Sequence, residues 1–234
     1  MNPTPQKVYS PVAAGCDTGA ELLKPHPLPE MFSNTGRSIQ MPAVKEEIPT
    51  ELKKLYSEEL GIDLDSGKDG EIFKWFLASY LMGKRIGEGI AKTTWHEFMQ
   101  AGLDTPQKIH DAGWDRLVEV LDSGNYDRYD YSTASRLLEV TGSLLDEYGG
   151  SLQKLHQEAA DEADLEHRLQ KLKGVGEVTA NIFLREMRKI WKKADPEPLD
   201  RVRKKAAQFD IDLDSMNRKT KTFMRTEAAL VRMR

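Results

Sequence analysis

Two glycines form the most informative pattern in this 234-residue chain. Gly174 and Gly176 flank Val175, and they lie between two segments with helical character. Glycine has no Cβ and adopts positive φ readily, so such a turn can direct consecutive backbone N–H groups outward at the start of the second helix. Unpaired N–H groups and the positive end of a helix dipole both favour an anion. The pattern therefore predicts a site for a phosphate oxygen, whatever base that phosphate carries.

The residues on both sides of this turn support the interpretation. Apolar residues recur at helical spacing: Leu165, Leu169 and Leu172 before the turn, and Val178, Ile182, Phe183 and Met187 after it. Thr179 and Ala180 are small where two closely packed helices would cross. The alternative is that Gly174 and Gly176 only end one helix and begin the next.

Residues 172–184, Leu-Lys-Gly-Val-Gly-Glu-Val-Thr-Ala-Asn-Ile-Phe-Leu, resemble the helix-hairpin-helix motif of the endonuclease III-like superfamily of DNA glycosylases. Residues 73–91 are similar to the first long core helix of that family, and residues 131–148 to the helix after its wedge region. The resemblance covers residues 71–208 and implies an all-α, two-lobed helical bundle with a cleft between the lobes. It assigns contacts with double-stranded DNA to residues of the hairpin: Lys173, Gly174, Val175, Gly176, Glu177 and Thr179.

The same resemblance implies a catalytic aspartate shortly after the hairpin. Departure of a base leaves an oxocarbenium-like sugar, which a nearby carboxylate stabilises. Asp195 and Asp200 both lie at about the family's distance. Asp195 precedes Pro196, an arrangement typical of a helix N-cap with proline at the first helical position, and this favours Asp195. Asp200 would lie about one turn inside that helix, beside Arg201, and either aspartate could instead be a cap or a surface charge.

The sequence departs from the family two residues after Gly176. Members that also cut the DNA backbone have a lysine there, which forms a Schiff base with the sugar. This chain has Val178 instead, so the resemblance implies a monofunctional glycosylase. A lyase would need a displaced lysine, such as Lys84, Lys192 or Lys193.

An enzyme that acts on a base in duplex DNA must flip the base and fill the gap with a side chain. The family's wedge follows its first long core helix, which makes Lys84 and Arg85 the candidates here; the alternative is that they cap a helix C-terminus. Tyr126, Tyr129 and Tyr131 lie in one polar loop and could stack on a base or line its pocket. They could equally anchor the loop onto the bundle.

The formal charge of −4 conceals an asymmetry. Residues 171–234 contain 17 Lys and Arg against 9 Asp and Glu, a net charge of +8, and the remainder of the chain carries −12. DNA responds to the charge of the face that it meets rather than to the average. A basic region directly after the predicted phosphate site therefore favours contact with the DNA backbone.

We expect no cofactor. The single cysteine, Cys16, excludes the four-cysteine iron–sulfur cluster that many members of the family carry. The five histidines show no metal-ligand spacing, although the resemblance allows a monovalent cation at the hairpin. No apolar run has the length of a membrane span, and the start of the chain lacks the apolar core of a secretion signal. We therefore expect a monomeric, intracellular protein of the cytoplasm or nucleoid, without membrane contact.

The pattern of prolines and apolar residues predicts the organisation of the chain. The first 49 residues contain eight of the eleven prolines, so residues 1–48 are expected to be extended or disordered. Residues 71–180 are expected to form a central bundle that ends in the hairpin, and residues 49–70 with 181–234 a second lobe. The predicted helices span residues 51–60, 71–82, 86–101, 105–112, 114–121, 132–148, 152–160, 164–172, 177–191, 196–209 and 216–233.

The leading hypothesis is a monofunctional base-excision glycosylase that hydrolyses the N-glycosidic bond of a damaged or mispaired base. A non-catalytic helix-hairpin-helix DNA-binding protein is the alternative. Val178, the ambiguity between two aspartates, and Lys173 in place of the family's usual proline all agree with that alternative. An abasic-site lyase that uses a displaced lysine is the third hypothesis.

Overall fold

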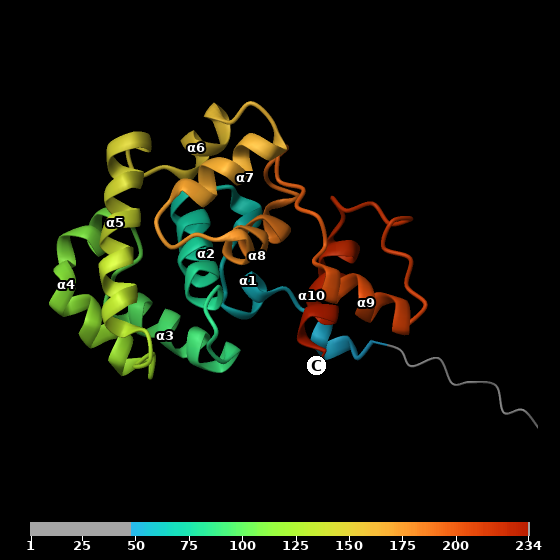
Figure 1. The fold of residues 1–234 in the computed structure, drawn as a ribbon, viewed down its shortest axis with the longest axis horizontal. Coiled ribbons are helices and arrows are strands. Elements are labelled where there is room, and N and C mark those ends of the chain that lie inside the picture. The colour runs from blue at the N-terminus through green and yellow to red at the C-terminus, as the bar shows by residue number, and fades with distance from the viewer. Residues whose placement is uncertain (1–47, 234) are drawn as a thin grey trace, which may run out of the picture. The chain divides into compact units, whose positions relative to one another are not determined.

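The computed structural model describes residues 48–233, and every regular element in this part of the chain is helical (Figure 1). The predicted all-α class is confirmed for these residues. The elements are η1 (Thr50–Lys53), α1 (Tyr56–Glu59), η2 (Leu64–Ser66), α2 (Asp69–Met82), α3 (Glu88–Gln100), α4 (Pro106–Ser123), α5 (Asp130–Tyr148), α6 (Leu152–Glu158), α7 (Glu162–Lys171), α8 (Glu177–Met187), α9 (Asp200–Gln208) and α10 (Lys221–Arg232). Within residues 48–233, no helix combines the length and the apolar character needed to cross a bilayer. Cys16 and the proline-rich segment 1–47 lie outside the described residues.

Helix α2 is the centre of the main hydrophobic core. Its side chains are apolar nearly all the way round, and such a helix must have partners on every side. It packs against α3 and α8, and Trp75 and Tyr80 are fully buried between these helices. The Trp75 indole donates a hydrogen bond to the Phe183 carbonyl of α8 at 3.0 Å. Helix α2 therefore fixes the position of α8, the helix that follows the glycine pair.

A buried carboxylate attaches the short helix α1 to α8. Glu186 is 2% exposed and accepts hydrogen bonds from the backbone N–H groups of Tyr56 and Ser57 at 2.9 and 3.0 Å. The Ser57 hydroxyl donates a third bond at 2.6 Å. These bonds satisfy N–H groups at the start of α1 that have no partner inside the helix. Burial raises the pKa of Glu186 above its usual range, although the neighbouring Arg185 acts in the opposite direction.

A second, smaller hydrophobic cluster joins η1, α9 and α10. Phe223 and Val202 are its most buried large side chains, and Ile48 contributes from the start of the described chain. Helix α8 contributes to the main core from Ala180 to Met187. The division into a central bundle and a second lobe stays a prediction.

Several predicted helix boundaries are wrong. The predicted helix 51–60 is two short helices, because Lys54 and Leu55 between them have extended backbones. Helix α8 ends at Met187 rather than at residue 191. Helix α10 begins at Lys221, where the Thr220 side chain accepts a hydrogen bond from the third residue of the helix at 3.2 Å. Helix α9 begins at residue 200 rather than 196, and this difference matters for the candidate site.

Candidate functional site

The glycine turn, which we define as residues 172–176, connects α7 to α8. Gly174 has a φ of 80°, in the left-handed region that favours glycine, and the Val175 N–H donates to the Leu172 carbonyl at 3.0 Å. Gly176 is the N-cap of α8 and offers no capping side chain, and the first helical bond runs from Ala180 N–H to the Gly176 carbonyl at 2.9 Å. The first N–H groups of α8 therefore have no partner inside the helix. This is the local geometry that the glycine spacing predicts, and the phosphate stays a prediction.

Side chains from α2 and the turn after it hold the glycine turn in place. The Tyr80 hydroxyl donates to the Lys173 carbonyl at 3.1 Å, and the Lys84 ammonium donates to the Gly174 carbonyl at 3.0 Å. The Lys84 ammonium also lies 5.0 Å from the centroid of the Tyr80 ring. Burial lowers the pKa of Lys84, and the nearby Arg136 acts in the same direction. A predicted wedge residue thus supports the backbone of the predicted phosphate site.

The turn after α2 also touches the first turn of α8 directly. A Cβ on Gly83 would lie 2.0 Å from the hydroxyl oxygen of Thr179, so only glycine fits there. Thr179 is 2% exposed, and its side chain therefore faces Gly83 rather than solvent. The predicted contact between Thr179 and DNA stays a prediction. Arg85 is exposed beside this junction, whereas Lys173 extends to an exposed pair with Glu139 at 3.6 Å.

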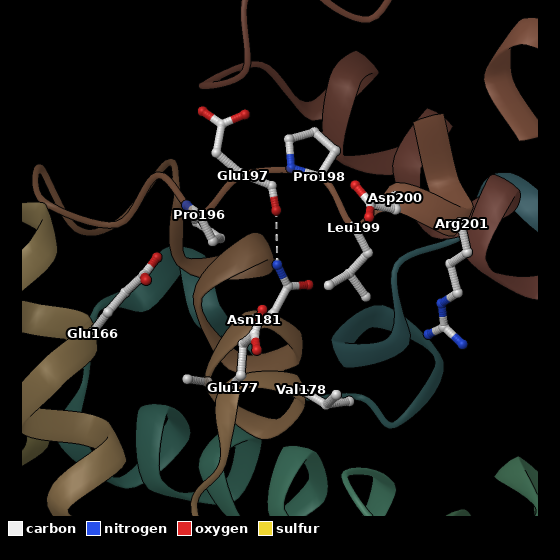
Figure 2. Close-up of a pocket in the computed structure, with 11 residues that line it drawn as sticks. Glu166, Glu177, Val178, Asn181, Pro196, Glu197, Pro198, Leu199, Asp200 and Arg201 are labelled. Carbon is white, nitrogen blue, oxygen red and sulfur yellow. Dashed lines mark hydrogen bonds between the residues drawn. The ribbon is translucent and has the colours of Figure 1, made fainter. Parts of the chain in front are cut away.

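An acidic hollow of about 540 Å³ lies between the first turns of α8 and the start of α9 (Figure 2). Four carboxylates line it, and Arg201 is the one cation among its lining residues. The residues that define it are Glu166, Glu177, Val178, Asn181, Glu197 and Asp200. Asp200 is the first residue of α9, so its carboxylate lies at a helix N-terminus, where negative charge is stabilised.

Asn181 contributes a free hydrogen-bond acceptor to the acidic hollow. Its side-chain Nδ2 donates to the Glu197 carbonyl at 2.9 Å, which determines the orientation of the amide (Figure 2). The residue is 7% exposed, and its Oδ1 has no hydrogen-bond partner among the described residues. Burial raises the pKa of Glu166 in the same hollow, and the charges of Glu177 and Glu197 add to this effect. The hollow therefore suits a ligand with hydrogen-bond donors.

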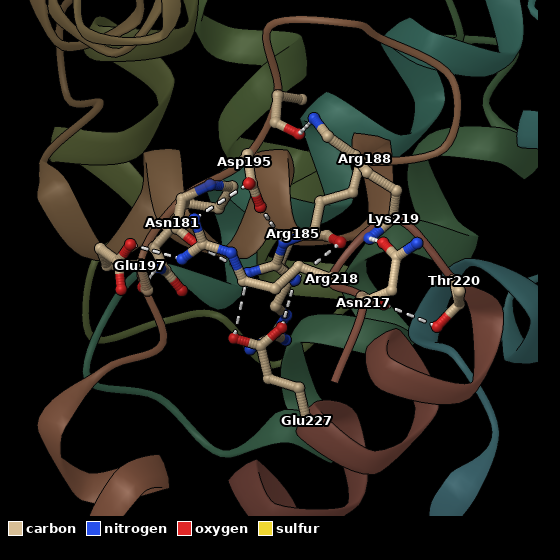
Figure 3. A network of polar contacts seen from close by, with 12 residues as sticks. Asn181, Arg185, Arg188, Asp195, Glu197, Asn217, Arg218, Lys219, Thr220 and Glu227 are labelled. Carbon is tan, nitrogen blue, oxygen red and sulfur yellow. Dashed lines mark hydrogen bonds and ion pairs between the residues drawn. The ribbon is translucent and has the colours of Figure 1, made fainter. Parts of the chain in front are cut away.

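A buried arginine holds the segment that leads to Asp200 (Figure 3). Arg188, the C-cap residue of α8, is 1% exposed, pairs with the buried Glu227 of α10, and approaches Asp195 Oδ1 at 3.2 Å. It also donates to the Pro196 carbonyl at 2.6 Å. Arg218 binds the other Asp195 oxygen at 2.9 Å. Both oxygens of the Asp195 carboxylate therefore form ion pairs with guanidinium groups.

The predicted environment of the two aspartates is wrong. Asp195 is not an N-cap, because α9 begins at Asp200, and Asp195 does not line the acidic hollow. Asp195 and Glu197 each precede a proline, which disfavours a helical backbone at both positions and delays the helix. Asp200 consequently lies at the start of α9 rather than one turn inside it. Of the two, it is the one that lines the hollow next to the glycine turn.

The three candidate base-pocket tyrosines lie elsewhere. Tyr126 is fully buried, and its hydroxyl donates to the Leu81 carbonyl at 2.8 Å, so it anchors its loop onto α2. Tyr129 is partly buried against the main core. Tyr131 is 62% exposed and stacks on Trp114, with 5.4 Å between the ring centroids. None of the three lines a hollow beside the glycine turn.

The interpretation of the sequence missed two residues that line hollows beside α8. Asn181 and Arg185 are polar residues of α8, and both are buried. Buried polar groups need hydrogen-bond partners, but the sequence does not show which polar residues of this helix are buried. Within residues 48–233, no group of three or more His, Cys, Asp or Glu side chains is arranged to hold a metal ion.

The glycine turn should tolerate substitution at one glycine and not at the other. A Cβ on Gly174 would lie 2.1 Å from the Tyr80 hydroxyl, and the φ of 80° would add strain, whereas a Cβ on Gly176 meets nothing within 4 Å. We expect Gly174→Ser to lower the free energy of unfolding by about 1–3 kcal/mol or more. Gly176→Ser should stay within about 0.5 kcal/mol of the wild type, since serine is a good N-cap. Urea unfolding measures both, and equal stabilities of the two variants would contradict this assignment.

The Arg188 network should be sensitive to removal of one partner. Arg188→Met leaves Glu227 charged and buried, which we expect to cost about 3–5 kcal/mol in urea unfolding. The double variant Arg188→Met/Glu227→Leu should recover much of this loss, because no lone buried charge remains. Arg225→Met is the control, since Arg225 forms an exposed pair with Glu58 at 2.7 Å. Its effect should be below about 1 kcal/mol, and a loss as large as that of Arg188→Met would refute the distinction.

No family model, no curated protein and no solved structure matches this chain. The interpretation of the site therefore depends on the geometry described above: a glycine turn with free N–H groups, a hollow that contains Asp200, and Val178 at the mouth of that hollow.

Proposed function

We propose that this chain is a DNA base-excision glycosylase that hydrolyses the N-glycosidic bond of a damaged or mispaired base, without lyase activity. One observation carries the proposal. The Asp200 carboxylate lines the same hollow as the first turn of α8, which begins at the glycine turn. A phosphate held by that turn would bring the adjacent sugar toward this carboxylate.

Duplex DNA is the proposed partner because the groups around the glycine turn suit a phosphate backbone. Free N–H groups at the start of α8 can bind a phosphate oxygen without reading the base. Lys84 and Arg85 supply positive charge in the adjacent turn after α2. The helix-hairpin-helix resemblance of residues 172–184 agrees with this assignment.

Asp200 is the proposed catalytic carboxylate. Within residues 48–233 its carboxylate has no ion-pair partner, whereas two arginines occupy Asp195. In the proposed reaction the bond between the sugar C1′ and the base nitrogen breaks, and the base leaves with the bonding electrons. Asp200 stabilises the oxocarbenium-like sugar and takes a proton from the water whose oxygen adds to C1′. Val178 is 47% exposed beside the hollow and has no amine, so no Schiff base forms at that position.

The proposal is tested with oligonucleotides that contain uracil, oxidised, alkylated or mismatched bases, treated with hot alkali after incubation. We expect an alkali-dependent strand break at the position of at least one of these bases. Asp200→Asn should lower the excision rate by at least about a hundredfold while duplex affinity stays within about threefold, since the carboxylate acts mainly in the transition state. Asp214→Asn is the control, because Asp214 is an exposed partner of Arg203. A wild-type rate for Asp200→Asn would exclude that residue from catalysis.

The same assay separates the alternatives. Duplex binding without excision of any base supports a non-catalytic DNA-binding protein. A break without alkali, together with covalent trapping by borohydride, supports a lyase that uses a displaced lysine. Lys84 would then be the first candidate, because its ammonium lies at the glycine turn and its pKa is lowered by burial.

Duplex binding should depend on Arg85. Each protein cation that neutralises a DNA phosphate contributes about one unit to the slope of log affinity against log salt. We expect Arg85→Gln to weaken binding and to reduce this slope by about one unit in fluorescence anisotropy. Lys108→Gln is the control, because Lys108 forms an exposed pair with Asp104 on the α4 side of the molecule. Equal slopes for the wild type and Arg85→Gln would remove Arg85 from the interface.

A further inference from the structure

A buried guanidinium without a partner lines a second hollow. Arg185 of α8 is 3% exposed, and its Nε and Nη1 atoms have no hydrogen-bond partner among the described residues. The hollow has a volume of about 460 Å³, and Val178 and Arg201 line it as well as the acidic hollow. Buried donors are nearly always satisfied in folded proteins, so this pair of N–H groups suits a ligand that accepts hydrogen bonds.

The neighbours of Arg185 do not supply that ligand. Its guanidinium lies 5.0 Å from the centroid of the Tyr56 ring, which attracts the charge but accepts no conventional hydrogen bond. The adjacent Glu186 accepts its hydrogen bonds from the start of α1 instead. Arg185 lines the hollow, and its Nε–H and Nη1–H groups bond to none of these neighbours.

The charge of this second hollow favours an anion. Lys84, Arg85 and Arg201 line it together with Arg185, and we call it the basic hollow after these four residues. Glu88 is the one carboxylate among its lining residues. Glu88 already pairs with Lys92 and accepts a hydrogen bond from the Tyr56 hydroxyl at 3.2 Å.

We propose that the basic hollow binds a phosphate group through the Arg185 guanidinium. A guanidinium forms charge-assisted hydrogen bonds with phosphate oxygens, and the surrounding cations balance the charge of the phosphate. The phosphate comes from DNA, either from a backbone diester or from a terminal 5′-monoester at a nick. Its origin in DNA rests on the proposed function, whereas capture of phosphate by Arg185 does not.

The first experiment uses inorganic phosphate, with chloride replaced so that ionic strength stays constant. In the wild type, phosphate should shift the Arg185 Nε–H signal in a ¹H–¹⁵N spectrum saturably and should raise the melting temperature, because a ligand of the folded state stabilises it. The signal is assigned by its loss in Arg185→Gln. That variant should also lose the thermal effect.

Two further variants keep the test independent of any folding defect in Arg185→Gln. Arg201 is exposed at the basic hollow, so Arg201→Gln should fold normally and weaken the phosphate response several-fold. Arg225→Gln removes an exposed arginine that pairs with Glu58, and its response should equal that of the wild type. Equal responses of the wild type and Arg201→Gln, or no shift of the Arg185 signal, would overturn the proposal.

Binding measurements with three DNA duplexes identify the source of the phosphate. Affinity is measured for an intact duplex with a stable abasic analogue, and for nicked duplexes that end in a 5′-phosphate or a 5′-hydroxyl. Preference for the 5′-phosphate by at least about tenfold, lost in Arg185→Gln, identifies a terminal monoester. Equal weakening of all three by Arg185→Gln identifies a backbone diester. Excision without any phosphate response overturns this inference and leaves the proposed function intact. A phosphate response without duplex binding supports phosphate capture by Arg185 and overturns the proposed function.

Discussion

The Arg188 guanidinium joins three segments that are distant in the sequence. It is buried at the C-cap of α8, pairs with Glu227 of α10, and binds the Asp195 side chain and the Pro196 carbonyl in the segment that leads to α9. A buried charge is tolerated only when its partners and hydrogen bonds are all in place, so these segments have one mutually consistent arrangement. The direction in which α9 leaves α8 depends on that arrangement. The salt bridges of Arg188 therefore position the Asp200 carboxylate, although Asp200 takes no part in them.

Local patterns predicted local structure well. The left-handed Gly174, the uncapped start of α8 and the buried α2 each follow from residues within a few positions of one another. The choice between Asp195 and Asp200 could not be predicted in this way. It depends on two prolines that suppress the helix and on a pairing between Arg188 and a residue of α10. The burial of Tyr126 was not predictable either. Its hydroxyl donates a hydrogen bond to the Leu81 carbonyl, 45 residues away, and no short-range pattern reveals that contact.

Two hollows of opposite charge share Val178 and Arg201. The acidic hollow offers carboxylates and the free Asn181 oxygen, whereas the basic hollow offers guanidinium and ammonium donors. A net charge of −4 describes neither of them. A polymer with an anionic backbone and bases that donate hydrogen bonds would match both hollows. Its backbone would suit the basic hollow and a base the acidic hollow, with Val178 between them.

The contact between Gly83 and Thr179 has a consequence for the thermodynamics of ligand binding. Because Gly83 packs against Thr179 without room for a Cβ, and Lys84 bonds to the Gly174 carbonyl, the turn after α2 cannot slide along α8. The spacing between the free amides and the adjacent cations is therefore established when the chain folds. A ligand that spans them meets a preorganised surface, and little of its binding energy is lost in ordering the protein.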